Sequence, residues 1–245
     1  MKQMKTLANR IAVWSIALAV VAGISTAHAQ SQQGKAAVTA VEGTAEYSTD
    51  GGAFMPLKVG TVLRSGSQVR TTGGSHVDLY LGKNNGVVRV ADATTVSVDK
   101  LTFSDTGADR VIDTQLNLKE GHLLGNASDK MAPASKYEIK TPNGVAGIRG
   151  TKYDIYVCRV IVIEGKVYFV HFAPGGKNVP FVVTAHNQFD CVTGLTPLPD
   201  DLYRSIEKEI NSISRGPGPE GISVPPYIEP FVSPINKPSR GGADG

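Results

Sequence analysis

Three glycines stand at a spacing of three in the stretch KTPNGVAGIRGTKYDIYV, residues 140–157. They are Gly144, Gly147 and Gly150, and Arg149 and Thr151 flank the last of them. Glycine-rich backbone binds phosphate when its amides point at the anion from the start of a helix. The residues after Gly150 instead alternate as a strand does, and the order Gly150-Thr151-Lys152 reverses the lysine and hydroxyl residue of the P-loop. We therefore expect a tight corner between strands rather than a phosphate or dinucleotide site.

Each residue type in this stretch suits such a corner. Thr141 precedes Pro142 and is therefore restricted to an extended conformation. The glycines permit positive φ and close backbone contact. Arg149 offers five donors from a rigid fork, which can tie together carbonyls or a carboxylate, and Thr151 can bond nearby backbone. We expect this motif to be structural rather than a partner contact.

The pattern of residues gives little indication of a catalytic site. The histidines after the first 29 residues are His76, His122, His171 and His186. None stands in a recognised nucleophile signature such as G-x-S-x-G, and a turn or strand histidine is the simpler interpretation of each. We predict no catalytic residue, no cofactor and no enzymatic activity, although a site assembled from distant residues stays open.

Two cysteines, Cys158 and Cys191, are the only ones in the chain. In an oxidising compartment a disulfide between them is the economical prediction, and it would stabilise the fold by roughly 3–4 kcal/mol. The alternative adds His171 and His186 to form a zinc site, but the spacing C-x12-H-x14-H-x4-C matches no common zinc pattern. We expect no metal.

The sequence from Val38 to about Cys191 has the pattern of successive β-strands. Runs such as SHVDLYLG and GKVYFVHF alternate in polarity, and turn residues that include glycine separate many of them. We predict one all-β domain at residues 38–195, an antiparallel β-sandwich or barrel-like fold. The run Arg159–Ile163 is apolar at four successive positions, which a central strand buried on both faces would explain.

The chain changes character after this domain. Leu202, Ile206, Ile210 and Ile213 fall on one stripe of a helix, which we place at residues 199–215. The stripe is expected to pack against the β domain, and a homo-oligomer seam is the alternative. Residues 216–245 hold seven of the 14 prolines and six glycines, a composition typical of a disordered tail. Apolar residues such as Tyr227 and Phe231 make a docking role possible there.

The first 29 residues are predicted to be a signal peptide. A basic start is followed by the apolar run 11–24 and by the small-x-small pattern Ala27-His28-Ala29. A short uncleaved anchor is the alternative, but after cleavage we expect no stable membrane span. Three of the 25 basic residues and none of the 22 acids lie in this segment, so the remaining chain is formally neutral. We therefore predict a periplasmic, cell-surface or secreted protein that does not bind nucleic acid.

The stretch TPNGVAGIRGTKYDIYV resembles the signature of FecR-like domains: Thr-Pro, small residues, then Val/Ile-Arg-Gly-Thr, an aromatic residue and a strand. The upstream sequence VEGTAEY…LKVGTVLRSGSQVRTTGGSHVDLYLG and the downstream VIVIEGKVYFV are similar to the family's other strands. The resemblance covers about Val41 to Phe172. It implies an all-β extracytoplasmic module, which in signalling members relays the state of a TonB-dependent transporter to a sigma factor.

Those signalling members carry a cytoplasmic anti-sigma segment and a transmembrane helix before the β domain. Only residues 1–10 precede the apolar run here, so we expect an exported form without that segment. The leading hypothesis is a non-enzymatic envelope module that binds, senses or scaffolds a protein partner, through an edge strand or a loop-rich face. The alternative is a glycan- or cell-wall-binding module, although exposed aromatic rings are scarce in the composition.

Overall fold

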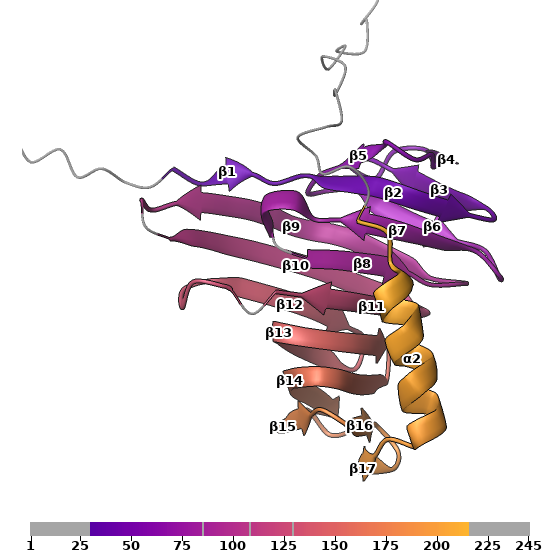
Figure 1. Ribbon diagram of the computed structural model, residues 1–245, viewed down its shortest axis with the longest axis vertical. Coiled ribbons are helices and arrows are strands. Elements are labelled where there is room, and N and C mark those ends of the chain that lie inside the picture. The colour runs from indigo at the N-terminus through magenta and orange to yellow at the C-terminus, as the bar shows by residue number, and fades with distance from the viewer. Residues whose placement is uncertain (1–29, 85, 108, 129, 216–245) are drawn as a thin grey trace, which may run out of the picture.

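The computed structural model describes residues 30–84, 86–107, 109–128 and 130–215 (Figure 1). The predicted signal peptide and proline-rich tail lie outside the described residues. The strands are β1 (Gln32–Gln33), β2 (Ala36–Glu42), β3 (Ala45–Ser48), β4 (Met55–Pro56), β5 (Val62–Leu63), β6 (Gln68–Thr71), β7 (His76–Tyr80), β8 (Gly86–Val90), β9 (Thr95–Asp105), β10 (Arg110–Glu120), β11 (His122–Ala127), β12 (Lys136–Thr141), β13 (Gly144–Tyr156), β14 (Arg159–Ala173), β15 (Lys177–Thr184), β16 (Asn187–Asp190) and β17 (Gly194–Pro197). A 3-10 turn, η2 (Gly82–Asn84), and the helix α2 (Asp200–Ser212) complete the set.

Two long strands, β13 and β14, fold the sheet into two layers. The first half of β13 pairs with β12 and the second half pairs with β11. Likewise, the first half of β14 pairs with β16 and the second half with β15. One layer therefore continues from β14 through β13, β11, β8 and β7 to β2, and the other continues through β13, β12, β10, β9 and β6 to β3.

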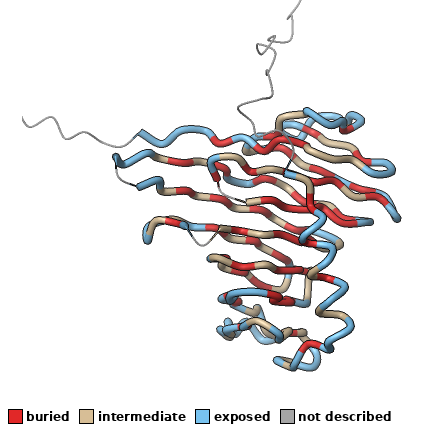
Figure 2. The backbone as a smooth tube through the Cα atoms, in the orientation of Figure 1, coloured by how far each residue is buried: buried red, intermediate tan, exposed pale blue. Residues whose placement is uncertain are grey.

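Alternation places the core between these layers (Figure 2). Inward side chains such as Leu79, Val98, Ile139 and Phe169 are almost completely buried in a single apolar cluster. The all-β fold predicted from the sequence is confirmed. One strand pair departs from the antiparallel prediction: β10 and β12 run parallel, because β11, which joins them in the sequence, pairs instead with β8 and β13 in the other layer.

The helix α2 covers the outer face of the layer that contains β8, β11 and the first half of β14 (Figure 1). Ile206, Ile210 and Ile213 are buried there, so the sheet occupies the apolar stripe of the helix. This packing explains the apolar run in β14. Val160 and Val162 point into the main core, whereas Ile161 and Ile163 lie under the helix. No helix in the described part of the chain is long and apolar enough to span a membrane.

Candidate protein-binding face

The predicted motif lies along β13 and the turn before it. At the turn, the Thr141 hydroxyl oxygen lies 3.2 Å from the Asn143 amide nitrogen, which donates to it, and 3.3 Å from the Gly144 carbonyl oxygen. Pro142 is exposed in the turn. A Cβ on Gly144 would approach the Phe169 ring and the Val170 carbonyl to 2.5 Å. Glycine is therefore required at position 144 because the neighbouring strand β14 and its Phe169 ring approach so closely.

The corner itself falls at Gly150, where β13 passes from one layer to the other. Its φ is 59°, and the strand register shifts between Arg149 and Lys152. On β14, Gly165 (φ 80°) faces this bend, and a Cβ there would lie 2.1 Å from the Gly150 carbonyl oxygen. Both strands bend at these two glycines, whose positive φ would be strained with a side chain. At position 165 a side chain would also collide with the Gly150 backbone.

Thr151 is the buried tie of the corner. Its single O–H hydrogen is shared between the Lys166 carbonyl at 2.8 Å and the Arg149 carbonyl at 3.0 Å, which lie on the two bent strands. Arg149 is exposed, and its Nη2 donates to the carbonyl of the buried Met131 at 2.8 Å. The arginine thus holds the segment before β12 against the corner, while most of its fork faces the surface.

A disulfide joins Cys158, in the turn between β13 and β14, to Cys191, in the turn after β16, with the Cα atoms 5.5 Å apart. Both cysteines are consumed in this bond. His171 Nδ1 lies 2.9 Å from the Asn143 carbonyl oxygen, and His186 stacks on Tyr203 of the helix. Within the described ranges no group of three or more histidine, cysteine or acidic side chains is arranged to hold a metal ion.

A buried ion pair under the C-terminal end of α2 was not foreseen from the sequence. Arg89 Nε and Nη2 donate to the two carboxylate oxygens of Asp78 at 2.7 and 2.9 Å. Arg89 Nη1 also donates to Ser212 Oγ, and the Ser214 amide donates to Asp78 Oδ2 at 2.8 Å. The alternating patterns SHVDLYLG and GVVRVAD place Asp78 and Arg89 facing outward, and only the docked helix buries them.

A second polar pair lies beside the helix. His122 Nδ1 and Asp154 Oδ1 are 2.8 Å apart, and the imidazole stacks on Tyr156 with the ring centroids 4.2 Å apart. Burial alone would lower the pKa of His122, but the hydrogen bond and charge of Asp154, joined by Asp92, outweigh it and raise that pKa. An aspartate can orient a catalytic histidine in this way, but the other nitrogen, Nε2, faces Asp92 at 3.7 Å rather than a nucleophile. The pair supports a structural role.

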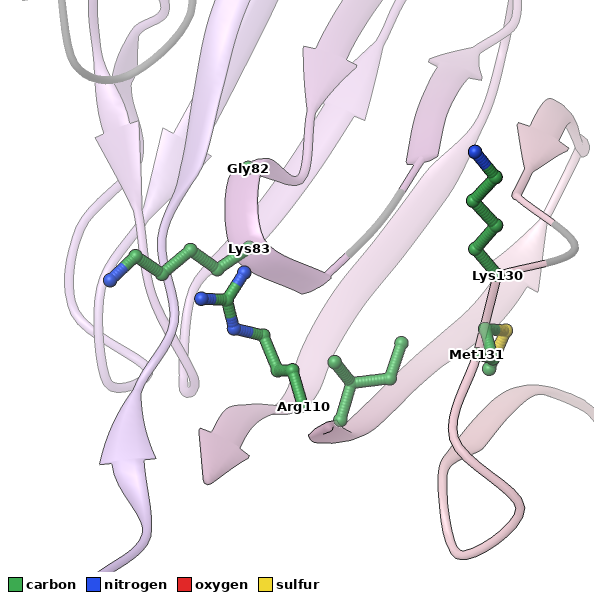
Figure 3. A pocket seen from close by; sticks show the side chains of 6 residues that line it. Gly82, Lys83, Arg110, Lys130 and Met131 are labelled. Atoms are coloured by element: carbon green, nitrogen blue, oxygen red, sulfur yellow. The ribbon is translucent and has the colours of Figure 1, made fainter. Parts of the chain in front are cut away.

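The pocket in Figure 3 is lined by Lys83, Arg110 and Lys130 together with Gly82, Ile112 and Met131. Three basic side chains suggest an anion site, but Figure 3 shows that they do not point at a common centre. Arg110 Nε binds Asp105 Oδ1 at 2.7 Å, and Lys83 Nζ lies over the Phe103 ring. The charges of Arg110 and Lys83 are therefore already engaged within the protein, and an anion-binding role has little support.

An exposed apolar surface covers the outer side of β13, β14 and β15. We call it the outer β14–β15 face and define it by Val145, Tyr168, Val170, Phe172, Pro180 and Val182, which the strand register places side by side. Tyr168 and Val182 are 48% and 47% exposed, and Phe172 is 44% exposed. Such a contiguous apolar surface is typical of an interaction site. The sequence carried a signal for it, because YFVHF is apolar or aromatic at successive positions, so both faces of the strand present such side chains.

Gly147 opens a hollow at one side of this face. The hollow has a volume of about 210 Å³, and Lys136, Glu138, Arg149 and Tyr168 are among the residues that line it. A Cβ on Gly147 would meet only the Tyr168 backbone oxygen and Cβ, at 3.5 and 3.8 Å, which is ordinary contact. Unlike Gly144 and Gly150, this glycine has neither a close approach nor a positive φ that requires it. The three motif glycines are thus not equivalent.

Comparison with known protein families matches the part of the chain that holds the motif and the two buried polar pairs. Residues 67–168 match the family described as FecR protein, which confirms the resemblance drawn from the motif. Two crystal structures, at 2.50 and 1.65 Å resolution, of "a putative anti-sigma factor from Parabacteroides distasonis ATCC 8503" are each 13% identical to this chain. Each match covers 54% of this chain and 59% of that protein, with TM-scores of 0.41 and 0.40. No curated protein matches the chain.

Proposed function

We propose, with the FecR domain at residues 67–168 as the premise, that this chain is an exported, non-enzymatic module that binds a protein partner in the cell envelope. The observation that carries the proposal is the outer β14–β15 face. Aliphatic and aromatic side chains exposed in a continuous patch are costly in water and are retained where a partner covers them.

The disulfide and the first 29 residues support the envelope location. Disulfides persist in oxidising compartments such as the periplasm, and the Cys158–Cys191 bond closes the part of the domain that carries the face. Cleavage before Gln30 is expected, and the intact mass of the exported protein measures it directly. A mature protein that retained Met1 to Ala29 would show that the segment is an anchor.

The buried groups of the domain support binding rather than catalysis. Asp78, Arg89, His122 and Asp154 have partners within the fold, which accounts for their unusual surroundings. Asp78 and Arg89 tie the sheet to the end of α2, and His122 and Asp154 tie β11 to β13, so the surface residues are left as the means of acting on another molecule. Turnover of any substrate in a broad panel of envelope compounds by the purified mature chain would contradict this proposal.

The test of the binding function is in-cell crosslinking of a tagged chain followed by purification from the native envelope. We expect a single envelope protein to be recovered in stoichiometric amount, both from the full chain and from a chain that ends at residue 215. Loss of the partner on truncation would assign binding to residues 216–245. Recovery of no protein would contradict a protein-binding function altogether.

A second candidate function, glycan or cell-wall binding, has one specific observation in its favour. Tyr168 and Phe172 expose rings on the same face of β14, and sugar-binding surfaces often use such rings. Sedimentation of the purified chain with isolated wall material tests this function. Co-sedimentation that Tyr168→Ser abolishes would favour it over protein binding.

A further inference from the structure

The outer β14–β15 face has a basic border on the side of β12 and the corner. Strand register places Lys140 beside Val145, and Arg149 beside Lys166, at the edges of the apolar patch. Lys136 lines the hollow beside Arg149, and Lys166 Nζ lies 5.4 Å from the centroid of the Tyr168 ring. Two acidic residues lie at this border: the Glu138 carboxylate accepts a hydrogen bond from Gln115, and Asp99 Oδ2 lies 3.9 Å from Lys140 Nζ, so the basic excess rests on Lys136, Arg149 and Lys166.

We propose that this face binds a protein partner that presents apolar side chains ringed by carboxylates, and that the Gly147 hollow receives one of those side chains. The inference rests on the proposed function and names the chemistry of the partner and the surface that meets it. An apolar centre supplies affinity through burial, and opposite charges around it set orientation and exclude other partners.

A second copy of this chain fits the face poorly. In a twofold dimer through this face the same patch meets itself, and the strand at its far side, β15, carries no Asp or Glu that could meet the basic border. Complementarity to the border therefore requires a different, acidic surface.

A membrane surface also fits poorly. The exposed side chains lie within strands rather than at the tips of loops, and each is only about half exposed. A sheet face of this shape is matched by a flat protein surface, whereas insertion into lipid needs protruding apolar groups.

The partner is expected to lie over the face rather than extend the sheet. In the described part of the chain, β15 pairs only with β14, so it is an edge strand. Pro180 in that strand has no amide hydrogen to donate, and proline on an edge discourages the addition of another strand. The exposed side chains, not the edge, therefore offer the contact.

The same inference explains why position 147 holds a glycine. Glycine within a strand is less stable than alanine by roughly 0.5–1 kcal/mol, and the backbone here gives no reason for it. The absence of a side chain leaves the hollow beside Tyr168 open. A partner side chain that enters the hollow accounts for a glycine that the fold does not need.

The experiment is site-specific photocrosslinking in the native envelope with the full chain. Benzoylphenylalanine replaces Tyr168 or Val182, and Ser104, on the polar outer side of β9 in the same layer, is the matched control position. We expect one discrete protein adduct from positions 168 and 182 and none from position 104. Gly147→Ala should lower the adduct yield about tenfold without lowering the melting temperature, because the added methyl group narrows the hollow but meets only ordinary contacts.

Charge-reversal variants test whether the basic border contributes to binding. Lys136→Glu with Lys166→Glu should reduce the yield about tenfold or more, and changing carboxylates of the captured protein to lysine should restore it. Insensitivity to charge reversal, equal adducts from position 104, or an adduct to a second copy, to residues 216–245, to lipid or to wall glycan would each overturn the inference. If protein adducts form only from positions outside this face, the inference fails while the binding function stands. If no position gives a protein adduct, both fail.

Discussion

Removal of Arg89 from its buried pair with Asp78 provides a quantitative test of how α2 is held to the sheet. Asp78 is 1% exposed and Arg89 is 7% exposed, and the two hydrogen bonds between them satisfy both carboxylate oxygens. Arg89→Met keeps much of the side-chain volume but leaves the Asp78 charge buried beside a single remaining donor, the Ser214 amide.

The expected cost is about 3–5 kcal/mol, the range found when one partner of a buried ion pair is removed. In a protein of this size 1 kcal/mol shifts the melting temperature by roughly 2–4 °C, so a fall of about 6–20 °C is expected. Asp78→Leu together with Arg89→Met removes both charges and leaves chiefly the Ser214 amide without its acceptor, at about 1–3 kcal/mol. The double variant should therefore be more stable than Arg89→Met alone.

The assay is thermal and urea unfolding of the mature chain with its disulfide intact, followed by circular dichroism. Arg70→Met is the matched control, because Arg70 pairs with Glu46 at the surface, where its side chain is 49% exposed, and such pairs contribute about 0–1 kcal/mol. The reasoning is refuted if Arg89→Met costs no more than the control, or if the double variant is no more stable than the single one.

Three further predictions concern other ties of the fold. Thr151→Val should lower the free energy of unfolding by about 1–3 kcal/mol, because the Lys166 and Arg149 carbonyls at the corner lose their hydroxyl partner, and urea unfolding measures it; a change below experimental error would show that water replaces that bond. Cys158→Ser with Cys191→Ser should cost about 2–5 kcal/mol and make the melting temperature insensitive to reductant, whereas an unchanged melt would show that the disulfide adds nothing to stability. The pKa of His122 is raised in the folded state, so its contribution to stability is complete below its unfolded pKa of about 6.5 and is lost as the pH rises through the higher folded value. His122→Gln should remove this part of the pH dependence of the melting temperature, and an unaltered pH profile would contradict the assignment.

The sequence by itself determined the class of the fold and the nature of the motif. Polarity alternates in SHVDLYLG because successive side chains of a strand point to opposite faces, and this local rule needs no tertiary information. The corner at Gly150 was predictable for the same reason, because a strand pattern after the glycines excludes a phosphate loop. The helix stripe at Ile206, Ile210 and Ile213 was equally readable, although its seat on the sheet was only one of two alternatives.

Only the tertiary structure decided which of these residues meet. The pairing of Asp78 with Arg89 depends on the register of β7 and β8 and on a helix more than a hundred residues later in the chain, so neither residue alone announces a buried pair. The three motif glycines looked alike in sequence, yet the close approach of β14 requires Gly144 and a bend requires Gly150, while a Cβ at Gly147 would meet only ordinary contacts. Burial is a property of what covers a side chain, not of the side chain itself. For that reason the sequence of β14 could show only that both of its faces carry apolar residues. The tertiary structure shows that α2 covers the outer face of the first half of the strand, whereas the outer face of the second half is exposed and left for a partner.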